Sequence, residues 1–262
     1  MTDGQVEVAL LGPVAVTGAA GIFRRPAALE LAVYLTFHRR RVGHAEWSLA
    51  LWPDRAVAPS TVHSTASDCR RALGRARDGV PHLPRGSTLQ LRDTVTTDVE
   101  RFASLAAPGD PVGVLAAMRL VRGPLFAGLH RVDWAVLDGT QAGVESMVAQ
   151  AALGAADRLM RSPDGAAAAA WIVRRALLLC PYDERLYRML LRGLDAQGNR
   201  AGLHAAMDEL CTLAGEAPRP RPRAGAARRP VGHANCLHPE TVALYEHLVG
   251  GQPAAGGHPA RL

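Results

Sequence analysis

Residues 59–74 read PSTVHSTASDCRRALG, and the spacing of the apolar residues in this stretch decides how the N-terminal part of the chain is interpreted. These residues follow one another at intervals of four, three and four positions, so they share one face of an α-helix. Ser60 is a suitable N-cap, and Gly74 is a suitable residue at which to end the helix. The stretch therefore predicts a helix from Ser60 to Leu73 that packs into a domain through one face. That face consists of Val62, Ala66, Cys69 and Leu73.

The opposite face of this predicted helix carries small polar and basic side chains. Such a surface can enter the major groove of duplex DNA without steric conflict, and its arginines can contact bases or phosphates. An ordinary solvated helix has a similar surface. Asp68 argues against DNA binding, because a carboxylate repels phosphates and can at best accept a hydrogen bond from cytosine N4. The face consists of Ser60, Ser64, Ser67, Asp68 and Arg71, flanked by His63 and Arg70.

The segments before this helix predict a small sheet and two further helices. Alternating apolar residues on both sides of Gly12-Pro13 predict a short antiparallel hairpin. Residues 26–38 are apolar nearly all round, which is typical of a helix buried on several sides. Residues 45–52 predict a short helix that Pro53 ends.

The segment after the helix completes the element order of a winged helix-turn-helix. Residues 89–92 alternate like a hairpin strand, and residues 85–87 lie where the tip of the wing is expected. Arg75 and Arg85 add candidate phosphate contacts on the C-terminal side of the helix. We therefore expect residues 1–95 to form an α+β winged-helix domain, and the residues alone leave open whether it binds DNA.

Charge is distributed unevenly along the chain, which has a formal net charge of +6. Residues 1–92 contain 12 arginines and seven acidic residues, residues 93–216 contain 12 and 15, and residues 217–262 contain six and two. A basic N-terminal part suits a polyanionic partner, because arginines that neutralise phosphates release counterions. The alternative is that arginine simply replaces lysine on solvated surfaces, since the chain contains no lysine.

The pattern after the predicted winged helix is helical almost throughout. Residues 183–197 and 201–213 predict an antiparallel pair of helices, and their spacing from Pro181 fits a 34-residue tetratricopeptide-like repeat. An ordinary bundle of amphipathic helices is the alternative. We expect a mainly α chain in which an all-helical, tetratricopeptide-like domain covers residues 96–250.

Two segments have the composition of chain that cannot build a core. Residues 216–232 interleave proline with arginine, so we expect a flexible segment there. One last helix is predicted over about residues 239–249. Residues 251–262 are rich in glycine and proline and predict a disordered tail.

Five motifs, taken in order, resemble those of a known group of regulators. They are LALWP at 49–53, RRALG at 70–74, VTTDVERF at 95–102, RGPLFAGL at 122–129 with Asp133-Trp134, and HPET at 238–241 with Leu244-Tyr245. With them the chain resembles the actinobacterial regulators that join an OmpR-type winged helix to a bacterial transcriptional activator domain. The SARP activators of antibiotic pathways belong to this group. The resemblance extends from about Val6 to Val249.

The resemblance implies a sequence-specific transcriptional regulator, expected to be an activator, that binds double-stranded DNA through a recognition helix over residues 60–73. The expected base contacts are Ser64, Ser67 and Arg71, the expected phosphate contacts are Arg70, Arg75 and Arg85, and Ser60 and His63 lie on the same face. The activator domain is expected to form a homodimer or to contact RNA polymerase.

The chain departs from the family pattern at Asp68, where the family usually carries a basic residue. A similar arrangement also ends large multi-domain proteins. The alternative function is therefore a protein-interaction or ligand-sensing regulatory module, in which the winged helix is structural and binds DNA weakly or not at all.

Several classes of activity lack their sequence signals. A P-loop and a Schiff-base enzyme both require a lysine, and the chain has none. The four cysteines lie too far apart for paired metal-ligand motifs and are too few for a disulfide framework. We expect no catalytic activity, no cofactor and no metal, and a cytoplasmic protein with reduced thiols and no membrane segment.

Overall fold

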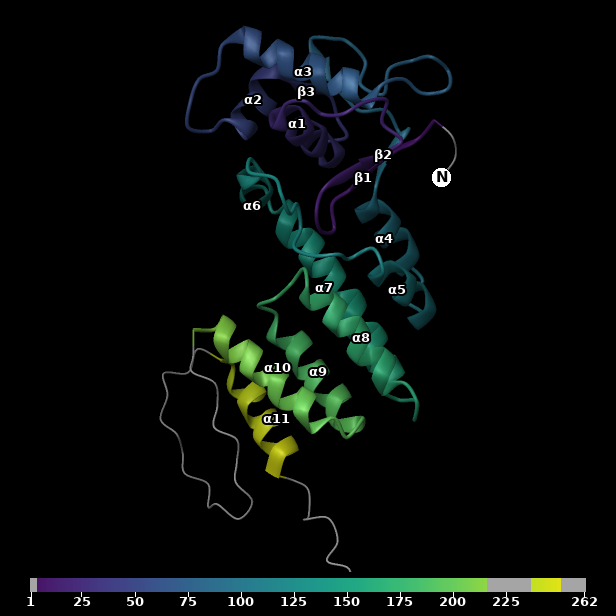
Figure 1. Ribbon diagram of the computed structural model, residues 1–262, viewed down its shortest axis with the longest axis vertical. Helices are drawn as coiled ribbons and strands as arrows, with labels where there is room; N and C mark the ends of the chain where they lie inside the picture. The colour runs from purple at the N-terminus through teal and green to yellow at the C-terminus, as the bar shows by residue number, and fades with distance from the viewer. Residues whose placement is uncertain (1–3, 216–236, 251–262) are drawn as a thin grey trace, which may run out of the picture. The chain divides into compact units, whose positions relative to one another are not determined.

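The computed structural model describes residues 4–215 and 237–250, which are mostly helical with a small sheet near the N-terminus (Figure 1). The predicted flexible segment at 216–232 and the predicted tail at 251–262 lie outside the described residues. The chain divides into two compact units. Unit 1 comprises Met1–Pro108 and Leu115–Val148, and unit 2 comprises Gly109–Val114 and Ala149–Leu262.

The sheet of unit 1 has three strands in the order β2-β1-β5. The predicted N-terminal hairpin is present, as β1 (Val6–Ala9) pairs antiparallel with β2 (Ala15–Thr17). Strand β5 (Val95–Thr97) pairs parallel with β1, with Val6 opposite Val95. This third strand was not predicted, because three residues followed directly by a helix show too short an alternation. The expected division of the chain after residue 95 stays a prediction, and β5 spans that position.

Three helices and a second, two-stranded sheet form the rest of the N-terminal part of unit 1. The predicted helices are α1 (Pro26–Phe37), α2 (His44–Leu51) and α3 (Pro59–Leu73). Strand β3 (Val42–Gly43) pairs antiparallel with β4 (Thr88–Leu89). The predicted strand over residues 89–92 is therefore shorter than expected and begins one residue earlier. The chain leaves the ladder after Leu89, and the Arg92 amide donates to the carbonyl of His82.

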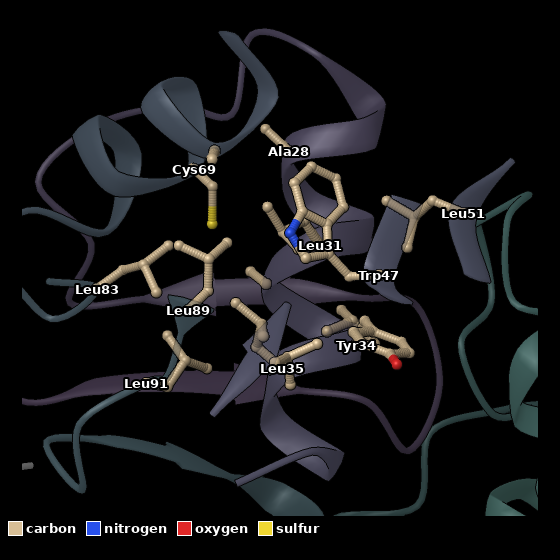
Figure 2. Packing of buried hydrophobic residues seen from close by; sticks show 14 of the residues in the cluster. Ala28, Leu31, Tyr34, Leu35, Trp47, Leu51, Cys69, Leu83, Leu89 and Leu91 are labelled. Atoms are coloured by element: carbon tan, nitrogen blue, oxygen red, sulfur yellow. The ribbon is translucent and has the colours of Figure 1, made fainter. Parts of the chain in front are cut away.

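The core of unit 1 forms where α1, α2, α3 and the strands meet (Figure 2). Cys69 points from α3 toward Leu83 and Leu89, and the Trp47 ring of α2 lies beside Leu31 of α1. All of these side chains are fully buried. Burial raises the pKa of the Cys69 thiol to about 12, so this thiol stays protonated and serves as a small apolar residue.

A buried carboxylate joins the end of β1 to a distant part of the chain. Thr97 and Glu100 form a capping box that begins helix α4 (Asp98–Ala106). The Asp98 carboxylate accepts hydrogen bonds from the amides of Leu10 and Leu11 at 2.7 and 3.1 Å, and from Arg122 at 3.2 Å. Burial raises the pKa of Asp98, and these donors oppose that shift. The contacts hold residue 122 at the end of β1.

Unit 1 is completed by residues that follow Arg122 in the sequence. Phe126 and Trp134 join the same hydrophobic core as α1, and their rings contact Phe37 at 5.6 and 6.1 Å between centroids. Buried Glu30 of α1 accepts hydrogen bonds from the amides of His130 and Arg131 and pairs with the Arg131 guanidinium at 2.8 Å. The N-terminal core therefore depends on residues beyond position 95.

The remaining helices follow α4 in the sequence. They are α5 (Pro111–Met118), α6 (Asp133–Leu137), α7 (Thr140–Leu159), α8 (Ala166–Leu177), α9 (Glu184–Ala196), α10 (Arg200–Leu213) and α11 (Pro239–Gly250). Within unit 2, α9 packs against α8, α10 and α11. The two helices predicted over 183–197 and 201–213 are present as α9 and α10, and the predicted last helix is α11. Tetratricopeptide-like packing stays a prediction.

Replacement of Asp98 tests how far the fold of unit 1 depends on this carboxylate. We expect Asp98→Ala to lower the free energy of unfolding by about 3 kcal/mol, because two amides and one guanidinium lose their acceptor. Urea denaturation followed by tryptophan fluorescence measures the change in a Trp171→Phe background, where the remaining tryptophans all lie in unit 1. Exposed Asp93→Ala is the control, and an equal effect of the two variants would contradict the prediction.

Candidate nucleic-acid interface

Helix α3 carries the candidate site and buries the stripe that its sequence predicts. Val62, Ala66, Cys69 and Leu73 are all buried, with at most 9% of each residue exposed. The predicted N-cap at Ser60 is wrong. Ala58 occupies the N-cap position without a side-chain hydrogen bond, and Pro59 begins the helix. Proline suits the first helical position because its φ is already fixed near the helical value. An N–H at that position would have no partner within the helix, so its absence costs nothing.

The predicted outer face of α3 differs in exposure along its length. Exposed side chains alternate with partly buried ones, and His63 makes an edge-to-face contact with the His44 ring of α2 at 5.4 Å between centroids. The exposed residues are Ser60, His63, Ser67 and Arg71, and the partly buried ones are Ser64, Asp68 and Arg70. The helix therefore presents Ser67 near its middle and Arg71 in its last turn to solvent.

Asp68 holds two arginines on this face. One carboxylate oxygen accepts from Arg71 at 2.9 Å, and the other pairs with the Nε of Arg25 at 3.0 Å. Arg25 also donates to the Ser64 hydroxyl at 2.6 Å. Two guanidinium groups and one carboxylate leave a local charge of +1, so the acidic residue does not make this face negative.

Arg25 is a member of the face that the sequence did not indicate. It lies just before α1, in a segment that packs along α3: the Gly21 amide donates to the carbonyl of Ala72 at 3.1 Å. Gly74 ends α3 with a φ of +80°, and a Cβ there would lie 2.4 Å from the Cβ of Ala20. Only glycine allows this approach. No periodicity links residue 25 to residues 64 and 68, so the sequence pattern does not indicate this contact.

The Arg70 side chain points toward the segment before β4, away from solvent. Its Nε donates to the carbonyl of Leu83 at 2.9 Å, and its Nη2 lies 3.4 Å from the carbonyl of Pro84. Burial lowers the pKa of this guanidinium, and Arg85 adds a smaller effect in the same direction. Arg70 thus fastens the segment before β4 onto α3. This structural role was not expected from the sequence, and a phosphate contact by Arg70 stays a prediction.

The two other predicted phosphate contacts lie beyond the helix. Arg75 is exposed and donates to the carbonyl of Gly79 at 2.6 Å, and Arg85 is exposed between α3 and β4. Their DNA-contact roles remain predictions.

Most other carboxylates of unit 1 that the structure describes are compensated by arginine. Each such pair places a positive charge next to a negative one, so these carboxylates contribute little long-range negative potential. The pairs are Glu7–Arg101, Glu30–Arg131, Glu46–Arg40, Asp78–Arg92, Asp98–Arg122 and Glu100–Arg39. The exposed arginines near α3 therefore face solvent with little opposing charge from these groups.

Two hollows lie on the surface of unit 1. One, of about 300 Å³, is lined by Ile22, Arg24 and the Asp68–Arg71 pair. The other, of about 570 Å³, lies along the end of α2 beside Leu49 and Trp52. Among the described residues, His, Cys, Asp and Glu side chains form no group of three that could hold a metal ion. None of the described helices is long and apolar enough to cross a bilayer.

Comparison with solved structures gives a match over nearly the whole chain. The chain is similar in fold to EmbR. The solved structure is that of Mycobacterium tuberculosis EmbR in complex with a low-affinity phosphopeptide, and the TM-score is 0.56 at 22% sequence identity. The match covers 96% of this chain and 66% of the EmbR chain. A scan against protein-family models gave no match, and a search of curated proteins gave none either. At this identity the likeness to EmbR concerns the fold.

Removal of the Arg70 side chain tests its structural role. We expect Arg70→Ala to lower the free energy of unfolding by about 1.5 kcal/mol, because two backbone carbonyls lose a charged donor. Arg85→Ala, which removes an exposed arginine of the same charge, is expected to change stability by less than about 0.5 kcal/mol. The measurement is urea denaturation followed by tryptophan fluorescence. Equal stability of the two variants would show that the Arg70 contacts contribute nothing to the fold.

Proposed function

We propose that this protein is a sequence-specific transcriptional regulator that binds double-stranded DNA. In this proposal helices α1–α3 with strands β3 and β4 form the winged helix, and α3 enters the major groove. The observation that carries the proposal is the division of α3 into two faces. One stripe is buried in the core, while Ser60, His63, Ser67 and Arg71 are left to solvent. Small polar side chains let the helix approach base edges, and arginine can contact guanine in two places.

Three further observations support a regulator. The fold is shared with EmbR over nearly the whole chain. The motifs occur in the order found in the actinobacterial regulators, and the N-terminal 92 residues carry an excess of arginine. In the proposed complex Ser64, Ser67 and Arg71 face bases, and Arg75 and Arg85 face phosphates. Arg70 holds the segment before β4 against α3 through the carbonyls of Leu83 and Pro84.

The all-helical domain expected over residues 96–250 is proposed to carry the contacts with other proteins. Tetratricopeptide-like stacking of α8, α9 and α10 suits a protein-binding surface. RNA polymerase and a second copy of this chain are the partners that the family resemblance implies. A transcription activator and a repressor share the same DNA-binding surface, so the direction of regulation depends on these contacts.

The test is selection of duplexes from a random DNA library by the full chain, followed by anisotropy titrations of the enriched sequence at several salt concentrations. We expect one motif to be enriched, with an affinity that falls steeply as salt rises. Arg71→Ala should weaken binding to the enriched sequence by about 1–3 kcal/mol and relax specificity at one base pair. Arg85→Ala should weaken binding to all sequences alike and lower the salt slope by about 1.

Arg161→Ala is the matched control, because it removes an exposed arginine from unit 2. It should leave DNA affinity unchanged. A selection that enriches no motif, or an affinity that does not respond to salt, would overturn the proposed function.

The alternative is a protein-interaction module with a structural winged helix. Exposed apolar side chains of unit 2 favour it: Trp171 and Leu178 follow one another along α8 and its end, and Tyr182 comes shortly after them. Large exposed apolar side chains near one another are typical of protein-binding surfaces. A partner protein captured by the wild type and lost in Trp171→Ala, together with no enriched DNA motif, would favour this alternative.

A further inference from the structure

The carboxylate of Asp68 is placed beneath the two arginines that it binds. The Asp68 side chain is 15% exposed, whereas Arg25 and Arg71 are 53% and 65% exposed. One carboxylate oxygen accepts a hydrogen bond from Arg71, and the other forms an ion pair with Arg25. The two more exposed arginines therefore shield the Asp68 carboxylate from a base such as cytosine, and the groups presented outward are cationic.

The pairing restricts Arg71 while leaving most of its donors available. The bond to Asp68 uses Nη1, which is one of three nitrogens in a planar group with five N–H donors. Free arginine side chains lose rotamer entropy when a ligand immobilises them, and an arginine held in advance loses less. Asp68 and Arg71 are three positions apart on one helix, so their side chains are neighbours on its surface and the ion pair restricts the directions that the guanidinium can take.

We propose that Asp68 is a positioning residue that aims Arg71 at the O6 and N7 atoms of one guanine. Arg25 completes the arrangement, because it pairs with the second carboxylate oxygen and donates to Ser64, so both oxygens are engaged while Asp68 faces Arg71. This inference rests on the proposed function and deepens it, since it assigns one base, a guanine, and the arginine that contacts it. Asp68 then contributes specificity, although its charge opposes the phosphates.

The charge of Asp68 and its geometry predict opposite effects of the same substitution. If the carboxylate only repels DNA, Asp68→Asn raises affinity for every duplex. If it positions Arg71, Asp68→Asn weakens binding to the preferred sequence and leaves binding to random duplex equal or stronger. The ratio of the two affinities therefore separates the two roles.

The experiment uses the full chain and the duplex enriched from a random library. Each guanine of that duplex is replaced in turn by 7-deazaguanine, which lacks the N7 acceptor. Anisotropy titrations compare wild type with Asp68→Asn, Arg71→Ala and the control Asp93→Asn, which removes an exposed carboxylate in the turn between β4 and β5. Thermal melting of each variant shows that it is folded.

We expect one guanine at which the 7-deaza substitution weakens wild-type binding about tenfold and has no effect on Arg71→Ala. Asp68→Asn should lower the ratio of specific to random affinity about three- to tenfold and reduce the response to 7-deazaguanine. Asp93→Asn should leave the ratio at the wild-type value.

Two results overturn this inference while the proposed function stands. In the first, a motif is enriched but Asp68→Asn has the same ratio as Asp93→Asn. In the second, Asp68→Asn raises affinity for the enriched and random duplexes equally. If the wild type enriches no motif, the proposed function and this inference fall together.

Discussion

Burial of one stripe of α3 is the constraint on which the rest of unit 1 depends. Val62 and Cys69 can reach the core only if the helix keeps one rotation about its axis, and that rotation decides which side chains face solvent. The polar face is thus a consequence of packing. A rotation by one residue would bury Ser67 or Asp68 without partners, at a cost of several kcal/mol. The exposed face is therefore as well defined as the core beneath it.

The buried Asp98 carboxylate gives unit 1 another long-range connection. A charge that is removed from water must be compensated by donors, and here they come from the end of β1 and from Arg122. Residues 95–102 and residues 122–129 meet at this group. This cluster of hydrogen bonds also accounts for Phe126 lying in the N-terminal core.

Arginine supplies every long basic side chain of this protein, and the structure uses it in two ways. Most arginines that pair with carboxylates fasten segments together, as Arg131 does with Glu30. Around α3 the arginines remain largely exposed even where they are paired, as with Arg71 and Asp68. The guanidinium group allows both uses at once, because five donors let it bind a carboxylate and still offer an edge to another acceptor. Lysine, a single charged point, lacks that second edge.

The sequence by itself determined α1, α2, α3, the N-terminal hairpin and the last helices, because each depends on a local period of apolar residues or on a proline or glycine at its end. It also determined four of the six residues that α3 buries, while Thr65 and Ala72 were not predicted. Only the tertiary structure decided that β5 joins the sheet, that Arg70 turns inward to Leu83, and that Arg25 and Asp68 share a site. These features depend on contacts between residues far apart in the chain, or on which of several acceptors one side chain contacts. Neither kind of contact produces a periodic pattern in the sequence.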